Sequence, residues 1–239
     1  MLAGSGGSGV MTAGNMLLEA AAHAGYYALM TRSSGPQIRG GEAAAMLRIA
    51  CEPVECMEDR FHVLAAVDWE NVQRFNAEIP LGPSSLILAD PDQGEPPEVF
   101  VKSGATRATL PLKKLAKSVP EGRANMVLLG ALAALLGLPD EAVATAVEKT
   151  LGKRPAALAP SLAAVAAGRA AAASIETRFP LAEPPPTRRA RWLLTGNEAA
   201  GYGAIKGGVR FVAAYPITPA TELLEWMAPA LAQVGGTLL

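Results

Sequence analysis

The sequence predicts two α/β domains, the first with a parallel-type sheet and the second represented only by its start. Three observations lead to this fold class. Apolar runs of strand length alternate with helix patterns over residues 10–151, as in a parallel sheet with crossover helices. A glycine-rich turn opens the first helix pattern, and a proline-rich segment precedes a second strand–helix alternation. We therefore expect a first domain at residues 1–178, a linker at 179–190 and the second domain at 191–239.

The first helix is predicted at residues 10–24, where apolar residues recur at helical spacing and Gly25 suits the position after the last turn. The apolar runs that predict strands lie at residues 26–30, 43–49, 63–67 and 85–89. A helix is expected at residues 69–75, between the last two strands. Strands that alternate with helices in this way favour a parallel sheet.

Three further helices are expected at residues 125–138, 139–151 and 156–174. The triple proline inside residues 179–187 favours a stiff, extended spacer, which is why the domain boundary is placed there. After it, the pattern predicts strands at residues 191–195 and 210–215 and helices at residues 198–206 and 220–234.

Composition excludes several classes of protein. The net charge is −1, with charges of both signs interspersed, so the chain has no electrostatic footprint for nucleic acid. The uncharged stretch at residues 124–139 is shorter than the roughly 20 residues that a membrane span needs. Glycines stand where a signal peptide would have a basic and an apolar region. We expect a cytoplasmic protein that binds neither nucleic acid nor membranes.

The sequence offers no set of metal ligands. Its two cysteines, Cys51 and Cys56, and its two histidines, His23 and His62, lack the spacing of a metal site. An iron–sulfur cluster is held by about four thiolates. We therefore expect no metal in this chain and two ordinary cysteines.

The turn at Gly4, Gly6, Gly7 and Gly9 fits G-x-G-x-x-G and opens a helix. Glycine lets the backbone approach an anion, and the N–H groups at a helix start attract phosphate. The dinucleotide pattern also requires an acidic residue about 20 positions later, where this chain has Thr-Arg-Ser-Ser at residues 31–34. Three readings stay open: a turn without ligand, another phosphate-bearing ligand, or NADP held through its 2′-phosphate.

The segment Tyr-Pro-Ile-Thr-Pro at residues 215–219 ends a predicted strand. Its two prolines lack an N–H and hold their neighbours in extended geometry, so the loop is rigid. It presents the Thr218 hydroxyl at the carboxyl end of the strand, where open α/β sheets bind ligands. The structural alternative makes Thr218 the N-terminal cap of the next helix.

Residues 1–175 resemble the gamma domain of the 2-oxoacid:acceptor oxidoreductase family, which is Rossmann-like. The resemblance lies in the glycine turn, in residues 12–14 and in the loop at 33–41 with its Gly-Pro and Arg-Gly-Gly. Residues 125–132 are similar to a late helix of that domain. Ser161 departs from the pattern, which has Asn there.

Residues 195–239 resemble the start of the thiamine-diphosphate pyrimidine-binding domain in the alpha subunit of 2-oxoacid:ferredoxin oxidoreductases. The motifs are Gly-Asn-Glu-Ala at 196–199, Gly-Ala-Ile at 203–205 and the Tyr-Pro-Ile-Thr-Pro loop, with Thr221 two residues later. A gamma domain that precedes an alpha domain in one chain is similar to the 2-oxoglutarate type.

The resemblance implies that Thr218 is catalytic and lies beside the thiamine and the substrate. It implies a cofactor-binding loop made of Tyr215, Pro216, Ile217, Thr218, Pro219 and Thr221. It also implies a site for a phosphate of coenzyme A, made of Gly4, Gly6, Gly7, Gly9 and Arg39.

The implied activity is oxidative decarboxylation of a 2-oxoacid, expected to be 2-oxoglutarate rather than pyruvate, to an acyl-CoA with electrons passed to ferredoxin. In this family a separate beta subunit holds the magnesium ion and an iron–sulfur cluster. The activating glutamate would lie beyond Leu239, so we expect a C-terminally truncated chain that is inactive alone. Two alternatives remain: an NADP-dependent Rossmann oxidoreductase and a non-catalytic module that docks a partner subunit.

Overall fold

The computed structural model describes residues 1–35, 41–70, 72–186 and 190–239. The chain forms two compact units, Met1–Arg188 and Arg189–Leu239, and each is described by itself. Among the helices of the described residues, none combines the length and the hydropathy that crossing a lipid bilayer requires.

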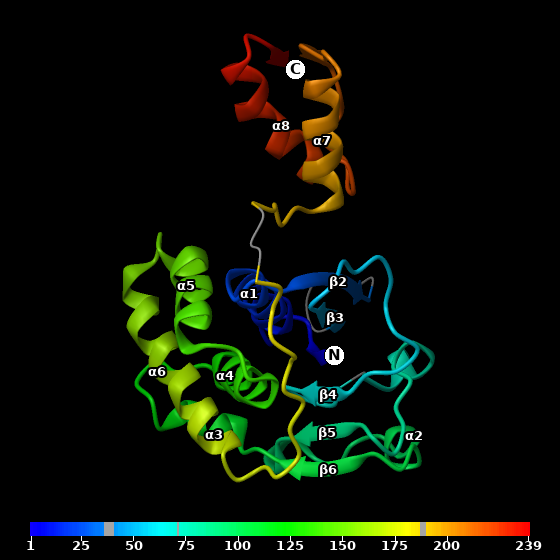
Figure 1. Ribbon diagram of the computed structural model, residues 1–239, viewed down its shortest axis with the longest axis vertical. Helices are drawn as coiled ribbons and strands as arrows, with labels where there is room; N and C mark the ends of the chain where they lie inside the picture. The colour runs from blue at the N-terminus through cyan, green and yellow to red at the C-terminus, as the bar shows by residue number, and fades with distance from the viewer. Residues whose placement is uncertain (36–40, 71, 187–189) are drawn as a thin grey trace. The chain divides into compact units, whose positions relative to one another are not determined.

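The first unit is built on a six-stranded sheet with the order β2-β3-β1-β4-β5-β6. The strands are β1 (Leu2–Ser5), β2 (Tyr27–Ser34), β3 (Glu42–Ala50), β4 (Val63–Ala66), β5 (Leu86–Ala89) and β6 (Thr106–Thr109). Strands β1, β4, β5 and β6 are parallel to one another. The predicted α/β class with a mostly parallel sheet is therefore confirmed (Figure 1).

Strand β3 departs from the expected alternation because it runs antiparallel to both β1 and β2. The segment that joins β2 to β3 is too short for the crossover helix that a parallel connection needs. β2 also continues to Ser34, so Ser33 and Ser34 lie in a strand and not in the polar loop expected at residues 33–41. Residues 36–40 of that loop lie outside the described ranges.

Helices cover both faces of this sheet. On one side lie α1 (Val10–His23), α3 (Leu112–Lys117), α4 (Ala124–Leu136), α5 (Asp140–Leu151) and α6 (Pro155–Ala172), which share the larger apolar core with the sheet. Within this group α5 packs on α1, and α6 packs on α4. The other face packs against the 3-10 helix η1 (Val72–Glu78) and the short α2 (Glu98–Val101). A further single 3-10 turn, η2 (Pro91–Gln93), follows β5. The helices expected at residues 125–138, 139–151 and 156–174 are confirmed by α4, α5 and α6.

Helices α4 and α6 lie in close backbone contact. A Cβ atom on Gly130 would collide with the carbonyl group of Val165, and one on Gly168 would collide with that of Val127. Only glycine at both positions lets the two backbones approach this closely.

The chain beyond α6 runs back along α4. Phe179 N–H donates to Leu135 O at 2.9 Å, and Leu181 N–H donates to Leu136 O at 3.1 Å. The start of the expected linker at residues 179–190 is therefore attached to the first unit.

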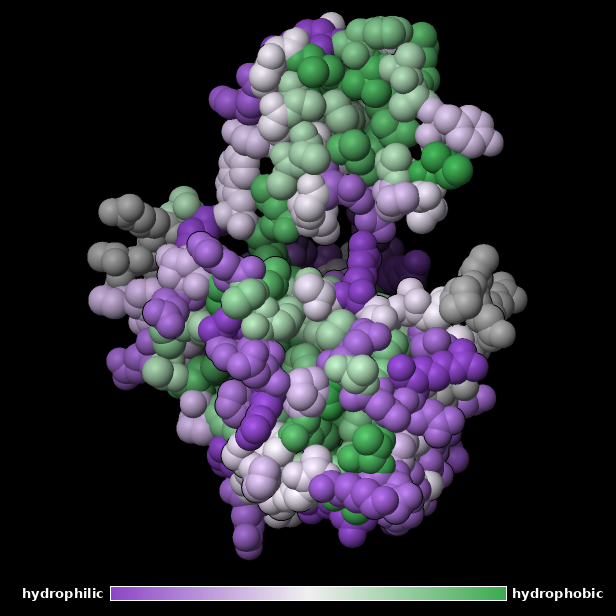
Figure 2. Space-filling model, turned by 90° about the vertical axis from the view of Figure 1, so that its right-hand side faces the viewer, coloured by the Kyte–Doolittle hydropathy of each residue, from purple (hydrophilic) through white to green (hydrophobic). Residues whose placement is uncertain are grey.

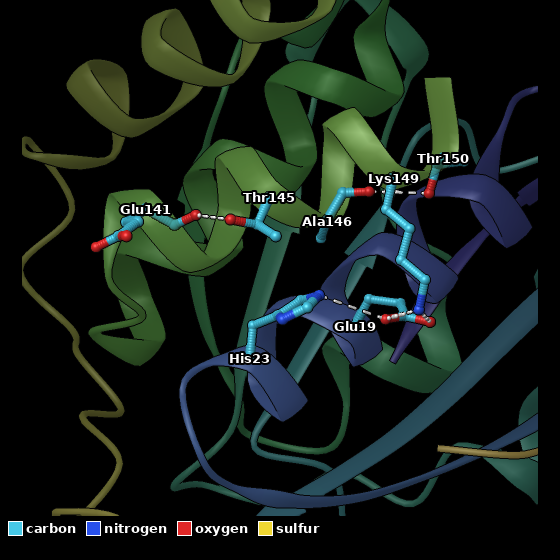
Figure 3. A network of polar contacts seen from close by, with 7 residues as sticks. All are labelled: Glu19, His23, Glu141, Thr145, Ala146, Lys149 and Thr150. Carbon is cyan, nitrogen blue, oxygen red and sulfur yellow. Dashed lines mark hydrogen bonds and ion pairs between the residues drawn. The ribbon is translucent and has the colours of Figure 1, made fainter. Parts of the chain in front are cut away.

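A polar network ties α1 to α5 (Figure 3). The Lys149 ammonium lies 2.9 Å from one Glu19 carboxylate oxygen, and His23 Nε2 lies 3.7 Å from the same carboxylate. His23 therefore sits in an ordinary surface network at the end of α1.

The second unit contains α7 (Gly196–Lys206), β7 (Phe211–Val212), α8 (Thr221–Gln233) and β8 (Thr237–Leu238), with β7 parallel to β8. The strand expected at residues 191–195 is wrong. Thr195 is instead the N-cap of α7, and residues 191–195 have no strand partner among the described residues. The strand expected at 210–215 is reduced to β7, because its partner β8 is itself only two residues long.

The second unit buries few apolar side chains and exposes many. Only Leu224, Met227 and Leu231 of its described hydrophobic side chains are buried. Figure 2 shows apolar atoms gathered on the surface of this unit. The large exposed side chains are Trp192, Leu194, Val209, Phe211, Tyr215, Ile217, Val234 and Leu239.

Candidate functional site

The glycine turn connects β1 to α1. Gly7 and Gly9 have φ angles of 95° and 86°, which side-chain-bearing residues rarely adopt. Gly9 is the N-cap of α1, and its carbonyl accepts a hydrogen bond of 3.1 Å from the buried Asn125 amide. A Cβ on Gly9 would collide with Asn125. The sequence pattern therefore identified a turn that does require glycine.

The first part of this turn already binds an anionic side chain. Ser5 N–H donates to both Asp68 carboxylate oxygens, at 3.0 and 3.1 Å, and the Ser5 hydroxyl donates to one of them at 2.9 Å. Gly6 N–H donates to Gly41 O. A phosphate at Gly4–Gly6 would compete with Asp68 for the same donors and be repelled by its charge. The remaining anion-binding capacity lies at Gly7, Gly9 and the start of α1.

Three helices begin at the wall of a cavity of about 670 Å³ beside that part of the turn. α1 begins after Gly9, α4 after Arg123 and α6 after Arg154, and none of these three N-caps makes a side-chain capping hydrogen bond. Each helix start carries a partial positive charge and unsatisfied N–H groups. Their convergence makes the cavity attractive to anions.

Side chains in the cavity wall reinforce this charge. The residues that line it are Ser5, Gly7, Ser8, Gly9, Val10, Met11, Thr12, Met16, Ala43, Arg123, Ala124, Asn125, Met126, Leu151, Arg154, Ala157 and Ser161. They include two arginines and no carboxylate. Ser161 is only 7% exposed, and its hydroxyl makes no hydrogen bond within the described ranges. The Ser8 hydroxyl oxygen is also buried without a partner, and such groups call for a hydrogen-bonding ligand.

Arg39 lies outside the described residues, but both ends of its loop are placed. Gly35 N–H donates to Glu42 O at 3.0 Å, and Gly41 contacts the glycine turn through Gly6. Glu42 is buried and forms a 3.1 Å ion pair with Arg74. A hydrogen bond from its own backbone N–H, followed by the bond from Arg74, lowers the pKa of the Glu42 carboxyl against the opposing effect of burial.

The sheet order speaks against the NADP alternative. In a dinucleotide-binding fold the residue that holds the ribose follows the strand beside β1. Here Arg32 lies in β2, an edge strand that β3 separates from β1. The parallel neighbour of β1 is β4, and it leads to Asp68, which is already bonded to Ser5.

The Tyr-Pro-Ile-Thr-Pro loop connects β7 to α8. Tyr215 and Ile217 are 79% and 62% exposed, and the Thr218–Pro219 peptide is cis. The N-cap of α8 is Ala220, without a side-chain capping bond, so the alternative that makes Thr218 the cap is wrong. The Thr218 hydroxyl is exposed and makes no hydrogen bond to another described residue.

The Gly-Asn-Glu-Ala segment at residues 196–199 lies in contact with the loop at residues 215–219. Asn197 Nδ2, from the first turn of α7, lies 3.4 Å from Pro219 O and 3.2 Å from a Glu222 carboxylate oxygen at the start of α8. Thr221 is the first residue of α8. Helix α7 is therefore in contact with the loop that carries Thr218.

Sequence reasoning missed Asp68, Arg123 and Arg154. No motif contains the two arginines, and their placement depends on where α4 and α6 begin. A usable signal was present: each arginine directly precedes a helix that lacks a Ser, Thr, Asp or Asn cap. Within the described ranges, no group of three or more His, Cys, Asp or Glu side chains could hold a metal ion.

These features define an α/β unit with a cavity lined by three helix starts and two arginines, joined to a unit whose exposed Thr-Pro loop follows a parallel strand. The chain belongs to the pyruvate ferredoxin/flavodoxin oxidoreductase family, whose model matches residues 1–171. A second family model, for the thiamine diphosphate-binding part of pyruvate flavodoxin/ferredoxin oxidoreductases, matches residues 202–238.

Individual relatives agree with this membership. The 2-oxoacid:ferredoxin oxidoreductase subunit alpha of Saccharolobus solfataricus is 27% identical over 93% of this chain, and the match covers 40% of that subunit. The 2-oxoglutarate synthase subunit KorC of Archaeoglobus fulgidus is 31% identical over 64% of this chain and 78% of the relative. The chain thus spans less than half the length of the alpha subunit.

A solved structure has the same fold over the whole chain. It is a 2-oxoglutarate:ferredoxin oxidoreductase from Magnetococcus marinus with 2-oxoglutarate, coenzyme A and succinyl-CoA bound. Its identity to this chain is 32% with a TM-score of 0.87, over 100% of this chain and 42% of the other.

Proposed function

We propose that this chain is part of a 2-oxoacid:ferredoxin oxidoreductase that converts 2-oxoglutarate and coenzyme A to an acyl-CoA and carbon dioxide and passes the electrons to ferredoxin. The observation that carries the proposal is the unpaired Thr218 hydroxyl on the exposed loop after β7, in a segment that matches the thiamine diphosphate-binding family model. The KorC relative and the Magnetococcus enzyme support 2-oxoglutarate as the substrate.

Thiamine diphosphate supplies carbanion chemistry when bound. The loop fits such a cofactor because it places exposed polar groups at the carboxyl end of a parallel strand, where ligands bind in open α/β sheets. In this proposal the Thr218 hydroxyl donates a hydrogen bond to the substrate carboxylate. Tyr215, Pro216, Ile217 and Pro219 hold that hydroxyl in position, and Thr221 fixes the junction with α8.

Coenzyme A carries phosphate groups, and the cavity at the three helix starts offers what phosphates require. Gly7 and Gly9 expose the N–H groups at the start of α1, while Arg123 and Arg154 supply charge. Arg39 is proposed as a third cation. For Gly4 and Gly6 we propose a structural role in the turn. The Ser5 N–H between them is bonded to Asp68, and the Gly6 N–H is bonded to Gly41 O.

The proposed partners are a beta subunit, which holds the magnesium ion and the iron–sulfur cluster, and ferredoxin. The chain supplies two cysteines, both free in the structure, whereas a cluster is held by about four thiolates. In this proposal the chain itself contributes Thr218 to the thiamine site and the cavity at the three helix starts to coenzyme A binding.

The test is a substrate survey of the purified oxidoreductase that contains this chain and its beta subunit. We expect ferredoxin reduction that requires both a 2-oxoacid and coenzyme A, with a higher kcat/KM for 2-oxoglutarate than for pyruvate. A preference for pyruvate would contradict the substrate. Reduction of NADP without any 2-oxoacid requirement would contradict the class of enzyme.

A further inference from the structure

We propose that Asn197 is a positioning residue, which holds the loop that carries Thr218 from the first turn of α7. This inference rests on the function proposed above for Thr218. It concerns a residue that binds neither cofactor nor substrate in that proposal and acts through the loop.

The start of α7 is a fixed support. The Thr195 hydroxyl accepts a hydrogen bond of 3.1 Å from Glu198 N–H, and the Glu198 carboxylate accepts one of 2.7 Å from Thr195 N–H. This reciprocal capping box gives a hydrogen-bond acceptor to the backbone N–H groups of both Thr195 and Glu198. Asn197 lies inside that turn, so its side chain extends from a backbone with little freedom.

Asn197 contacts the loop at the residue after Thr218. Its amide lies 3.4 Å from Pro219 O and 3.2 Å from a Glu222 carboxylate oxygen. An asparagine amide has two N–H donors, so it can serve both acceptors at once. The first contact holds the loop, and the second holds the first turn of α8.

The loop has few other attachments. Two of its five residues are prolines without an N–H. Ile217 N–H donates to Tyr215 O, and Ala220 N–H donates to Ile217 O, but both bonds are local. Leu224 N–H of α8 donates to Ala220 O, but Ala220 is the N-cap of that helix. For residues 215–219, the contact from Asn197 is the only hydrogen bond that comes from another helix or strand within the described part of the chain. Asn197 therefore limits the freedom that the prolines leave to the Thr218–Pro219 segment.

The substitution Asn197→Asp tests this role. It keeps the size of the side chain, removes both N–H donors and places a carboxylate beside Glu222. The double variant Asn197→Asp with Glu222→Gln restores the bridge to α8 with donor and acceptor exchanged, but it leaves Pro219 O without its donor. Glu225→Gln is the matched control, because Glu225 is exposed on the same helix and has no contact assigned to it.

Two measurements on each variant separate positioning from simple stability. The first is amide hydrogen exchange at Ile217, Thr218, Ala220 and Thr221 in the full chain. The second is kcat/KM for the 2-oxoacid in the assembled enzyme. We expect Asn197→Asp to speed exchange in this loop and to lower kcat/KM about threefold to tenfold, as for the loss of one neutral hydrogen bond. The double variant should recover only part of this loss, and Glu225→Gln should change neither quantity.

Unchanged loop exchange in Asn197→Asp would overturn the inference. Faster exchange with an unchanged kcat/KM would overturn it as well. The outcome for the proposed function is separate, because it depends on Thr218→Ala. If Thr218→Ala does not affect turnover, the function assigned to the loop fails, while the exchange data still report whether Asn197 holds it.

Discussion

Arginine side chains at two helix starts give the cavity its charge. We predict that Arg123→Gln and Arg154→Gln each weaken coenzyme A binding by about threefold to tenfold, because exposed charge-assisted contacts to phosphate are moderate in strength. Isothermal titration calorimetry on the full chain would measure this, with Lys153→Gln as the control. Lys153 is the exposed neighbour of Arg154 but does not line the cavity. Equal binding of coenzyme A by the native chain and the three variants would contradict the proposed placement of the phosphates. Binding of NADP but not of coenzyme A would support the NADP-dependent oxidoreductase instead.

Glu42 is a buried carboxyl of the first unit that is paired with Arg74. Because its pKa is lowered from 4.5 in the folded state, the unfolded state binds its proton more readily. The Glu42 contribution to stability is therefore present above the unfolded pKa and is lost as the pH falls through the lowered, folded pKa. We predict that Glu42→Gln reduces the free energy of unfolding near neutral pH and that the difference from the native chain shrinks below 4.5. Urea denaturation at several pH values measures this, and a difference independent of pH would contradict it.

Residue-scale prediction succeeded where a single residue type has a unique property. The positive φ angles of Gly7 and Gly9 are what a G-x-G-x-x-G pattern anticipates. The same pattern gave no hint that Asp68 occupies the first donors of the turn, because Asp68 follows β4 and reaches the turn only through the parallel pairing of β1 with β4. A contact between residues so far apart in the chain follows from the sheet order, which the pattern does not contain.

At the scale of elements, the contact between α4 and α6 depends on two glycines. We predict that Gly168→Ala destabilises the first unit by about 1–3 kcal/mol, the usual cost of overpacking a core, because the new Cβ meets the Val127 carbonyl. The control is Gly203→Ala in α7, where a Cβ has open space and helix propensity favours alanine. Denaturation curves that show equal or higher stability for Gly168→Ala would contradict the close helix contact.

The long helices were predictable from sequence because periodicity and length agree over many residues. The short strands were less predictable from the sequence than the long helices. Residues 191–195 have an apolar character but no partner strand among the described residues, and Thr195 instead begins α7. Strand β3 runs antiparallel to β2 because the connection between them is too short for a crossover helix. The alternation of strands and helices in the sequence had led us to expect a parallel strand there. The short α2, β6 and α3 fell in a region without a clear period, and no element was expected there.

At the scale of the whole molecule, the two units differ in what they bury. The first encloses an extensive core on both faces of its sheet. Among its described residues, the second buries three large apolar side chains and exposes eight. The chain also spans only 40% of the length of the Saccharolobus alpha subunit. The cavity proposed for coenzyme A lies wholly in the first unit, and the loop proposed for thiamine diphosphate lies in the second, so the proposed reaction needs groups from both.

The measurement that tests this account most directly is single-turnover decarboxylation of 2-oxoglutarate by the assembled enzyme with Thr218→Ala, beside its melting temperature. A hydrogen bond to a charged group is worth about 1.5–3 kcal/mol, so we predict a chemical step slowed about tenfold to a hundredfold. The melting temperature should stay nearly unchanged, because Thr218 caps no helix. An unchanged chemical step with a lowered melting temperature would show that Thr218 is only structural and would contradict the role proposed for this chain at the thiamine.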